Sequence, residues 1–148
     1  MDNLIIMKTN PIVKEITIPS DLNTVWEAIT NPEKMKEWYF EVNDFRLEKD
    51  NEFYFYEPGS AQKYRHLCKI IDIIPNRKFK HTWTFPDYSS GISTLTWELT
   101  EHEGNTHVKL THEGVENFAN AGNDFTRKSF DAGWEEIVTQ NLVNYLIQ

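Results

Sequence analysis

Two histidines, His81 and His112, lie where the sequence could place an imidazole inside the protein. His81 alternates with Phe79 and Trp83 in one expected strand, and His112 follows Leu110 with the same alternation in another. Because alternate residues of a strand share one face, we expect both imidazoles to point inward, where they must form hydrogen bonds. One interpretation is a satisfied core or rim histidine. The other is a polar anchor for the headgroup of a bound ligand.

Other catalytic arrangements are scarce. The only thiol, Cys68, lies in an expected strand without a base beside it. The sequence has no glycine-rich phosphate loop, GxSxG elbow or HExxH helix, which argues against the common kinase, dinucleotide-binding, hydrolase and zinc-protease designs. Acid–base chemistry by Asp72, Glu98 or Glu113 stays open, because a sequence does not reveal which side chains meet across strands. We expect no cofactor and no metal site, since the histidines lack a defensible third ligand.

Aromatic side chains are numerous, with five Trp, six Tyr and nine Phe among 148 residues. Such rings form ordinary cores, and they also form the walls of mostly apolar pockets. Strand alternation and helical spacing direct a subset of them inward. With the two histidines, this subset forms the candidate ligand-binding set: Trp38, Phe53, Phe55, His81, Trp83, Phe85, Trp97, His112, Phe118, Phe130 and Trp134.

The segment around Phe118 has two interpretations. It lies between Glu113 and Asn123, and small residues flank the ring on both sides. A single exposed ring is common on protein surfaces and needs no functional explanation. The alternative is a mobile flap whose ring covers the mouth of a cavity.

The elements that must position these residues begin with a strand and two short helices. The alternating segment 12–18 predicts the strand. Ser20 is expected to cap the first helix, which ends near Asn31. Asn31 and Pro32 then predict a second N-cap followed by proline in the first helical position. This helical turn should continue through Met35 and lead Trp38 into a strand.

The rest of the chain predicts a sheet and a covering helix. From residue 39 to residue 112, six alternating segments separated by turn residues indicate strands joined as an antiparallel meander. From about residue 124 to residue 148, one wide apolar stripe predicts a long helix that can cover the sheet. We expect Trp134 to anchor this helix in the core, with Gly133 allowing close approach to the sheet.

Composition limits the class of protein. The chain has 39% hydrophobic residues and no apolar run long enough for a membrane-crossing helix. Its 23 acidic and 15 basic side chains give a net charge of −8, which disfavours binding to nucleic acid or anionic membranes. A single cysteine excludes an internal disulfide, and the first residues lack a secretory pattern. We expect one cytoplasmic domain over residues 1–148, monomeric or homodimeric, with residues 1–10 as a loosely ordered extension.

Four stretches, in this order, resemble a known family: 25–33 with Trp38 downstream, 73–75 leading to Trp83, 105–114, and Gly133 with Trp134. They are similar to the START-like (SRPBCC, helix-grip) superfamily, in particular to the carboxy-terminal domain of the activator of heat-shock-protein-90 ATPase. The similarity covers nearly the whole chain. One departure is the bulky segment 64–68, in a region where the family often carries glycine.

The resemblance implies an α+β helix-grip fold. In this fold a curved antiparallel sheet of about seven strands wraps around a long carboxy-terminal helix, with two short helices after the first strand. Relatives use the space between sheet and helix for lipids, sterols, polyketides and other hydrophobic molecules, or grip a chaperone in the stress response. The leading hypothesis is therefore a nonenzymatic protein that binds a small hydrophobic ligand. The alternatives are a cochaperone-like interaction domain and a cyclase- or aromatase-like enzyme that uses the same cavity.

Overall fold

A curved six-stranded antiparallel sheet is the framework of the protein in the computed structural model, which describes residues 10–57 and 64–148. The spatial order is β1-β6-β5-β4-β3-β2, so the last five strands form a meander and β1 pairs with β6. This arrangement confirms the predicted antiparallel meander. Most of the expected extension, residues 1–9, lies outside the described residues. The strands are β1 (Ile12–Ile18), β2 (Glu52–Tyr56), β3 (Arg65–Ile74), β4 (Lys78–Trp83), β5 (Ser93–His102) and β6 (Asn105–Glu113).

The strand count in the described residues is six, and the expectation of about seven was wrong. The strand expected to begin at Tyr39 is an irregular segment that joins the sheet at a single bridge between Asn43 and Tyr54. Asp44 follows with a φ of 62°. A left-handed residue cannot continue an extended strand, so pairing stops there.

The two short helices form almost where the sequence predicts them. Helix α1 (Leu22–Thr30) is capped by Asp21, whose side chain accepts the amide of Thr24 at 2.8 Å, so the expected cap at Ser20 was one residue early. Asn31 caps α2 (Pro32–Trp38) through the amide of Glu33 at 3.0 Å, which confirms the predicted cap and the proline after it. Helix α2 continues through Trp38, beyond the predicted end at Met35.

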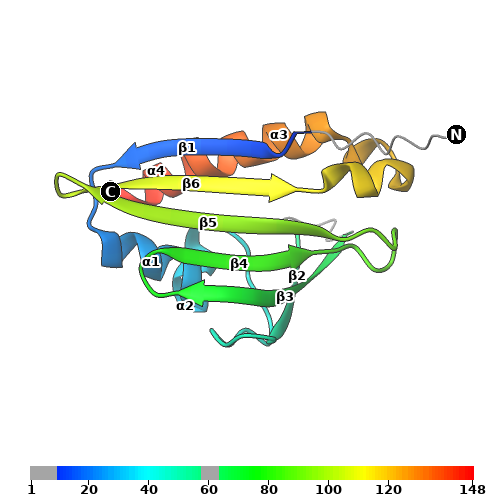
Figure 1. Ribbon diagram of the computed structural model, residues 1–148, viewed down its shortest axis with the longest axis horizontal. Coiled ribbons are helices and arrows are strands. Elements are labelled where there is room, and N and C mark those ends of the chain that lie inside the picture. Colours follow the sequence, from blue (N-terminus) through cyan, green and yellow to red (C-terminus); the bar gives the residue numbers. More distant parts are fainter. Residues whose placement is uncertain (1–9, 58–63) are drawn as a thin grey trace, which may run out of the picture.

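The carboxy-terminal helix is continuous but not uniform. Helix α3 (Arg127–Glu136), a π-helical turn, η3 (Ile137–Asn141), and α4 (Leu142–Leu146) follow one another directly. The helix begins after the Thr126 cap because residues 123–125 form a separate 3-10 turn, η2, which follows another, η1 (Val115–Ala121). Figure 1 shows the long helix along the sheet behind β1 and β6, with α1 and α2 at one end.

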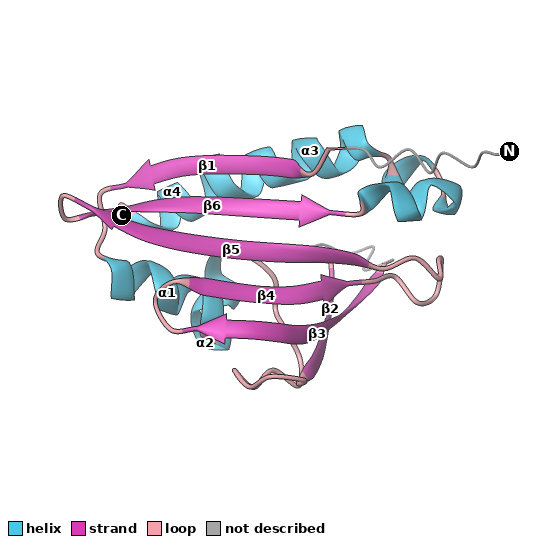
Figure 2. Ribbon diagram, viewed as in Figure 1, coloured by secondary structure: helices cyan, strands magenta, loops and turns pink. Residues whose placement is uncertain are grey.

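The core fills the space between the sheet and this helix. The predicted apolar stripe is confirmed, because each of its members is buried or packs against the core: Phe130, Trp134, Ile137, Val138, Leu142, Tyr145 and Leu146. At the edge of this layer, Lys14 of β1 contacts Asp131 at 2.8 Å and Glu135 at 3.0 Å on α3. Figure 2 shows the strands as one layer in front of α3 and α4. No helix in the described part of the chain is long and apolar enough to span a membrane.

Candidate functional site

A pocket of about 130 Å³ lies between the sheet and the first turns of the long helix. We call it the helix–sheet pocket. It reaches the surface where the exposed Ser129 lines it. Because ligand pockets for drug-sized molecules usually measure about 300–1,000 Å³, this pocket suits a single ring or a short chain. Its lining residues are Phe40, His66, Trp83, Ser129, Phe130, Gly133, Trp134 and Ile137.

A chain of hydrogen bonds fixes one wall of the pocket. The indole Nε1 of Trp134 donates to Nδ1 of His112 at 2.9 Å, so Nδ1 carries no proton. His112 therefore carries its proton on Nε2 and donates it to Ser93 Oγ at 2.7 Å. The Ser93 hydroxyl in turn donates to the carbonyl of Trp83 at 3.2 Å. These hydrogen bonds connect helix α3 to strands β6, β5 and β4.

His112 is neutral in the folded protein. Burial, with a smaller contribution from charge repulsion by the neighbouring His81, lowers the pKa of His112 to about 3. Since the protein occupies both ring nitrogens, His112 holds Trp134 in place and has no free nitrogen to offer a ligand headgroup.

His66 of β3 is the titratable side chain in the pocket wall. Its ring stacks on Phe55 with centroids 4.5 Å apart, and its Nδ1 lies 2.9 Å from the Tyr64 carbonyl. Burial lowers the pKa of His66 to about 4, while hydrogen bonds to the Phe55 and Tyr64 backbone act in the opposite direction. The pocket therefore presents a neutral imidazole at physiological pH.

One buried polar group in the pocket wall has no partner. The indole Nε1 of Trp83, a side chain only 3% exposed, finds no hydrogen-bond acceptor among residues 10–57 and 64–148. The Tyr39 hydroxyl is likewise unpaired within this part of the chain, but Tyr39 is not among the lining residues. Burial, with the nearby Cys68 thiol, raises the pKa of Tyr39 well above its usual value.

The structure brings three of the eleven candidate residues into the pocket wall, namely Trp83, Phe130 and Trp134. The other eight are buried in the surrounding core: Trp38, Phe53, Phe55, His81, Phe85, Trp97, His112 and Phe118. Most of the expected space between sheet and helix is thus filled by the protein's own rings, and the pocket is the remainder.

Two expectations for individual residues need correction. Phe118 is fully buried and packs against Phe85 at a centroid distance of 5.1 Å, so it is not an exposed ring, and it is not among the residues that line the pocket. Gly133 does not serve a close approach, because a Cβ atom added there would meet no neighbouring heavy atom within 4 Å. The glycine instead leaves space on the side of the helix that lines the pocket.

His81 is buried as its strand alternation predicts, but it lies outside the pocket wall. Its Nδ1 donates to the carbonyl of Thr82 at 2.8 Å, and its ring lies 5.1 Å from that of Phe53. Burial lowers the pKa of His81 to about 4. Its place in a ligand site remains a prediction.

Sequence reasoning missed several lining residues, above all Phe40 and His66. A signal for His66 was present, because it shares strand alternation with Cys68 and Ile70, and all three are buried. Phe40 gave no such signal, since it lies in the irregular segment after α2. Its position becomes evident only when its ring stacks on Phe55 at 4.4 Å.

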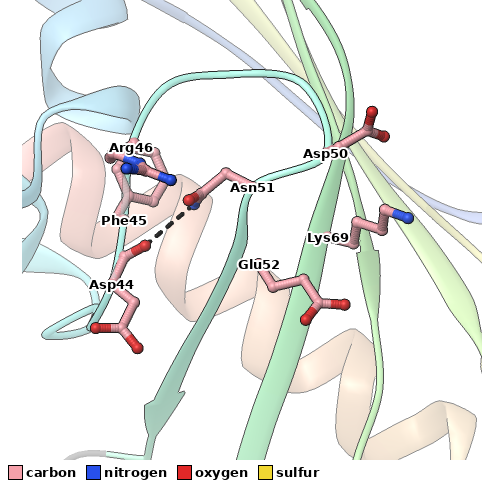
Figure 3. A pocket seen from close by; sticks show the side chains of 7 residues that line it. All are labelled: Asp44, Phe45, Arg46, Asp50, Asn51, Glu52 and Lys69. Atoms are coloured by element: carbon pink, nitrogen blue, oxygen red, sulfur yellow. Dashed lines mark hydrogen bonds between the residues drawn. The ribbon is translucent and has the colours of Figure 1, made fainter.

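Two other depressions are open and charged. The larger, about 590 Å³, is seen in Figure 3, where Asn51 donates to the backbone oxygen of Asp44 at 3.2 Å. Five of its seven lining residues are exposed charged side chains, which water already solvates: Asp44, Arg46, Asp50, Glu52 and Lys69. The second lies on the outer face of α3 around Ala132. Within residues 10–57 and 64–148, no three His, Cys, Asp or Glu side chains gather as metal ligands.

Solved structures support the fold. DynU16, described as a protein in the dynemicin biosynthetic locus, superposes with a TM-score of 0.75 at 17% identity over 93% of this chain. The chain spans about half, 47%, of DynU16. Protein BH1534 of Bacillus halodurans superposes with a TM-score of 0.73 at 23% sequence identity. The match covers 94% of this chain and 98% of BH1534. PFC0360w, described as an HSP90 activator from Plasmodium falciparum, superposes with a TM-score of 0.65 at 20% sequence identity. The match covers 90% of this chain and 92% of PFC0360w. Comparison with curated proteins gives no match.

The curved sheet around a long carboxy-terminal helix defines a helix-grip fold. The family described as Activator of Hsp90 ATPase homolog 1-like protein matches residues 20–146. The chain belongs to this family, as the resemblance of its four stretches predicts.

Proposed function

We propose that the protein binds a small hydrophobic molecule in the helix–sheet pocket. The observation that carries this proposal is a wall of Phe40, Trp83, Phe130 and Trp134 around an unfilled space of about 130 Å³. An apolar cavity of roughly 150 Å³ is known to accept benzene in another protein, so one ring is a suitable size for the ligand. A lipid chain would have to displace side chains of the core.

The electrostatics of the pocket favour binding over acid–base catalysis. A general acid or base works best with a pKa near the operating pH. The pKa of His66 is lowered to about 4, so this imidazole is already neutral and a weak base at pH 7. This weak base supports ligand binding better than it supports an enzyme that uses acid–base catalysis.

Toluene tests the proposal, because its single ring matches the space. We expect toluene to raise the melting temperature in a saturable, concentration-dependent way, since it binds only the folded state. Gly133→Leu should fill the pocket and abolish this rise. Ala132→Leu is the matched control, because Ala132 is exposed on the outer face of the same helix. An equal response in Gly133→Leu and the parent protein, or no binding below millimolar toluene, would contradict the proposal.

Chaperone binding is the second candidate function. It is supported by the family and by the fold shared with PFC0360w, described as an HSP90 activator. Such binding would use the outer surface, so a purified heat-shock chaperone should respond equally to the parent protein and to Gly133→Leu. Stimulation of the chaperone's ATPase by both proteins, with no toluene response in the parent, would favour this second function.

A further inference from the structure

The wall of the helix–sheet pocket consists mainly of aromatic rings. Four of the described lining residues are Phe or Trp, and His66 adds an imidazole. The plane of Trp83 is inclined by 63° to that of Trp134 and by 80° to that of His66. It is inclined by 61° to the plane of Phe40. Rings at such steep angles to one another border the space on different sides.

The hydrogen-bonding groups of these side chains are already used or buried. The indole nitrogen of Trp83 is enclosed by the protein, so other atoms of this residue line the pocket. The indole nitrogen of Trp134 donates to His112 at 2.9 Å, and Nδ1 of His66 donates to the Tyr64 carbonyl at 2.9 Å. Selective recognition of a ligand in this pocket therefore depends mainly on the rings themselves.

The electrostatics of the pocket favour a positive group over a negative one. No Lys, Arg, Asp or Glu is among the described lining residues, and burial keeps His66 neutral by lowering its pKa to about 4. The charge that acts on His66 is that of a carboxylate, Glu57. Aromatic rings carry partial negative charge on their faces and attract cations. The net charge of −8 on the whole chain acts in the same direction.

The apolar wall also restricts the kind of cation. A protonated amine has N–H groups that would lose their hydrogen bonds to water in such a wall. A quaternary ammonium group has no N–H, and clusters of aromatic rings are its usual binding sites. A trimethylammonium group has fewer heavy atoms than benzene, which a cavity of roughly 150 Å³ accepts in another protein. The space of about 130 Å³ is therefore large enough for it.

Building on the proposed function, we propose that the ligand of the helix–sheet pocket carries a quaternary ammonium group, which the aromatic rings of the wall enclose. The rest of the ligand leaves through the mouth at Ser129, where the pocket reaches the surface. Free choline and the headgroup of phosphatidylcholine both present such a group.

Choline and 3,3-dimethylbutan-1-ol test the inference, because they have the same shape and differ in a positively charged nitrogen against a neutral carbon. Calorimetric titration at constant ionic strength measures the affinity of the parent protein for each. We expect choline to bind about tenfold more tightly, because the rings attract its charge. Phe130→Leu replaces one ring of the wall by an aliphatic side chain and should reduce this preference by about threefold or more.

Phe45→Leu is the matched control. Phe45 is half-buried like Phe130, but it lines the charged depression of Figure 3 and not the helix–sheet pocket. This variant should keep the full preference for choline. A loss of choline binding in Phe45→Leu but not in Phe130→Leu would place the cation at the charged depression and overturn the inference.

A second measurement needs no variant that must fold. In the parent protein, the N-methyl protons of bound choline should give nuclear Overhauser contacts to ring protons of Trp83, Phe130 and Trp134. They should also shift upfield, as protons above ring faces do. Ring protons of Trp38 and Trp97, which are not among the lining residues, are internal controls. Bound choline without contacts to the three pocket rings would contradict the inference.

Dihexanoylphosphatidylcholine, a soluble short-chain lipid, distinguishes the two sources of the group. Tighter binding of this lipid than of choline would assign the pocket to a lipid headgroup. Weaker binding would assign it to a free small molecule. Both results support a quaternary ammonium site, provided that choline shows its preference over the neutral alcohol.

The outcomes separate the inference from the proposed function. If toluene and 3,3-dimethylbutan-1-ol bind, and choline binds no more tightly than the alcohol, the quaternary ammonium inference is wrong while pocket binding stands. If none of the three binds to the parent protein, both proposals fail. A preference for choline that falls in Phe130→Leu and is kept in Phe45→Leu supports both.

Discussion

Trp134 combines two stabilising roles in one side chain. Its ring is 3% exposed and contacts both the Trp83 and His112 rings. Its Nε1 also satisfies His112, and through His112 the hydroxyl of Ser93. Packing and hydrogen bonding at this residue can be separated by choosing what replaces the indole.

Trp134→Ala should lower the free energy of unfolding by about 3–5 kcal/mol, because it leaves a cavity in the core. Trp134→Phe keeps most of the packing but removes the donor to His112, and it should cost about 1–3 kcal/mol. Denaturant titration measures both. Glu136→Ala, an exposed change on the same helix, is the control. An unfolding midpoint of Trp134→Ala equal to that of the parent would contradict the core placement.

For single residues, the sequence predicts whether a side chain points inward better than it predicts the hydrogen-bond partners of that side chain. Alternation was enough to place His81 and His112 inside. It could not reveal that both ring nitrogens of His112 are hydrogen-bonded to Trp134 and Ser93, because these residues meet only after two strands and a helix pack together. For the same reason it gave no warning that Trp83 would lack an acceptor.

Among the elements, the long helix contains a position that weakens it. Gly133 lies inside α3, where glycine costs about 0.5–1 kcal/mol relative to alanine. Neither a positive φ nor a close neighbour requires glycine there. A small residue at this position instead keeps the pocket open.

Gly133→Ala should therefore raise the free energy of unfolding by about 0.5–1 kcal/mol through helix propensity alone. The added methyl group should also reduce the space available to toluene and weaken its binding. Denaturant titration and a toluene titration of the same variant measure the two effects. A destabilised Gly133→Ala protein would indicate that the helix needs this glycine for a reason other than the pocket.

The elements themselves were largely predictable, because local signals and burial agreed. Asn31 with Pro32 gave a cap that formed as expected, and the periodic stripe of the last helix formed throughout. The errors lie where a local signal was ambiguous. Ser20 and Asp21 are both good caps, and the segment after Tyr39 has strand-forming residues that the left-handed Asp44 interrupts.

Three buried histidines link the stability of the whole molecule to pH. His66, His81 and His112 lie on three different strands, and burial lowers their pKa values to about 4, 4 and 3. In the unfolded chain each would titrate near pH 6.5, so below that pH the unfolded state binds more protons than the folded state. Their contribution to stability is present above pH 6.5 and is lost as the pH falls toward 4.

The free energy of unfolding should fall by up to about 1.4 kcal/mol per pH unit for each of these histidines, or up to about 4 kcal/mol per unit for all three, with roughly half of that slope at pH 6.5 itself. Urea titrations between pH 6.5 and 5 measure this slope in a range above the ordinary pKa of carboxylates. His66→Gln should reduce the slope by about a third. A stability that stays constant over this range would mean that the histidines are not buried in neutral form.

On the scale of the whole chain, the family was predictable from four short stretches, and the size of the pocket was not. Its volume is what remains after side chains from distant segments, such as Phe40 and Ile137, have met across the core. A difference of one ring in packing separates a filled core from a pocket, and no sequence pattern is sensitive to that difference.

The hydrogen-bond chain from Trp134 to the Trp83 carbonyl also separates two timescales in one small region. The Trp134 indole proton is held by His112, so it exchanges with deuterium only when the helix lifts from the sheet. The Trp83 indole proton, on a ring 5.2 Å away, has no acceptor in the described residues, and its nitrogen is buried although other atoms of the residue line the pocket. It exchanges only when the surrounding side chains move enough to admit a water molecule to the nitrogen. Hydrogen exchange at the two neighbouring indoles therefore reports two different motions, the separation of the long helix from the sheet at Trp134 and a local rearrangement of side chains at Trp83.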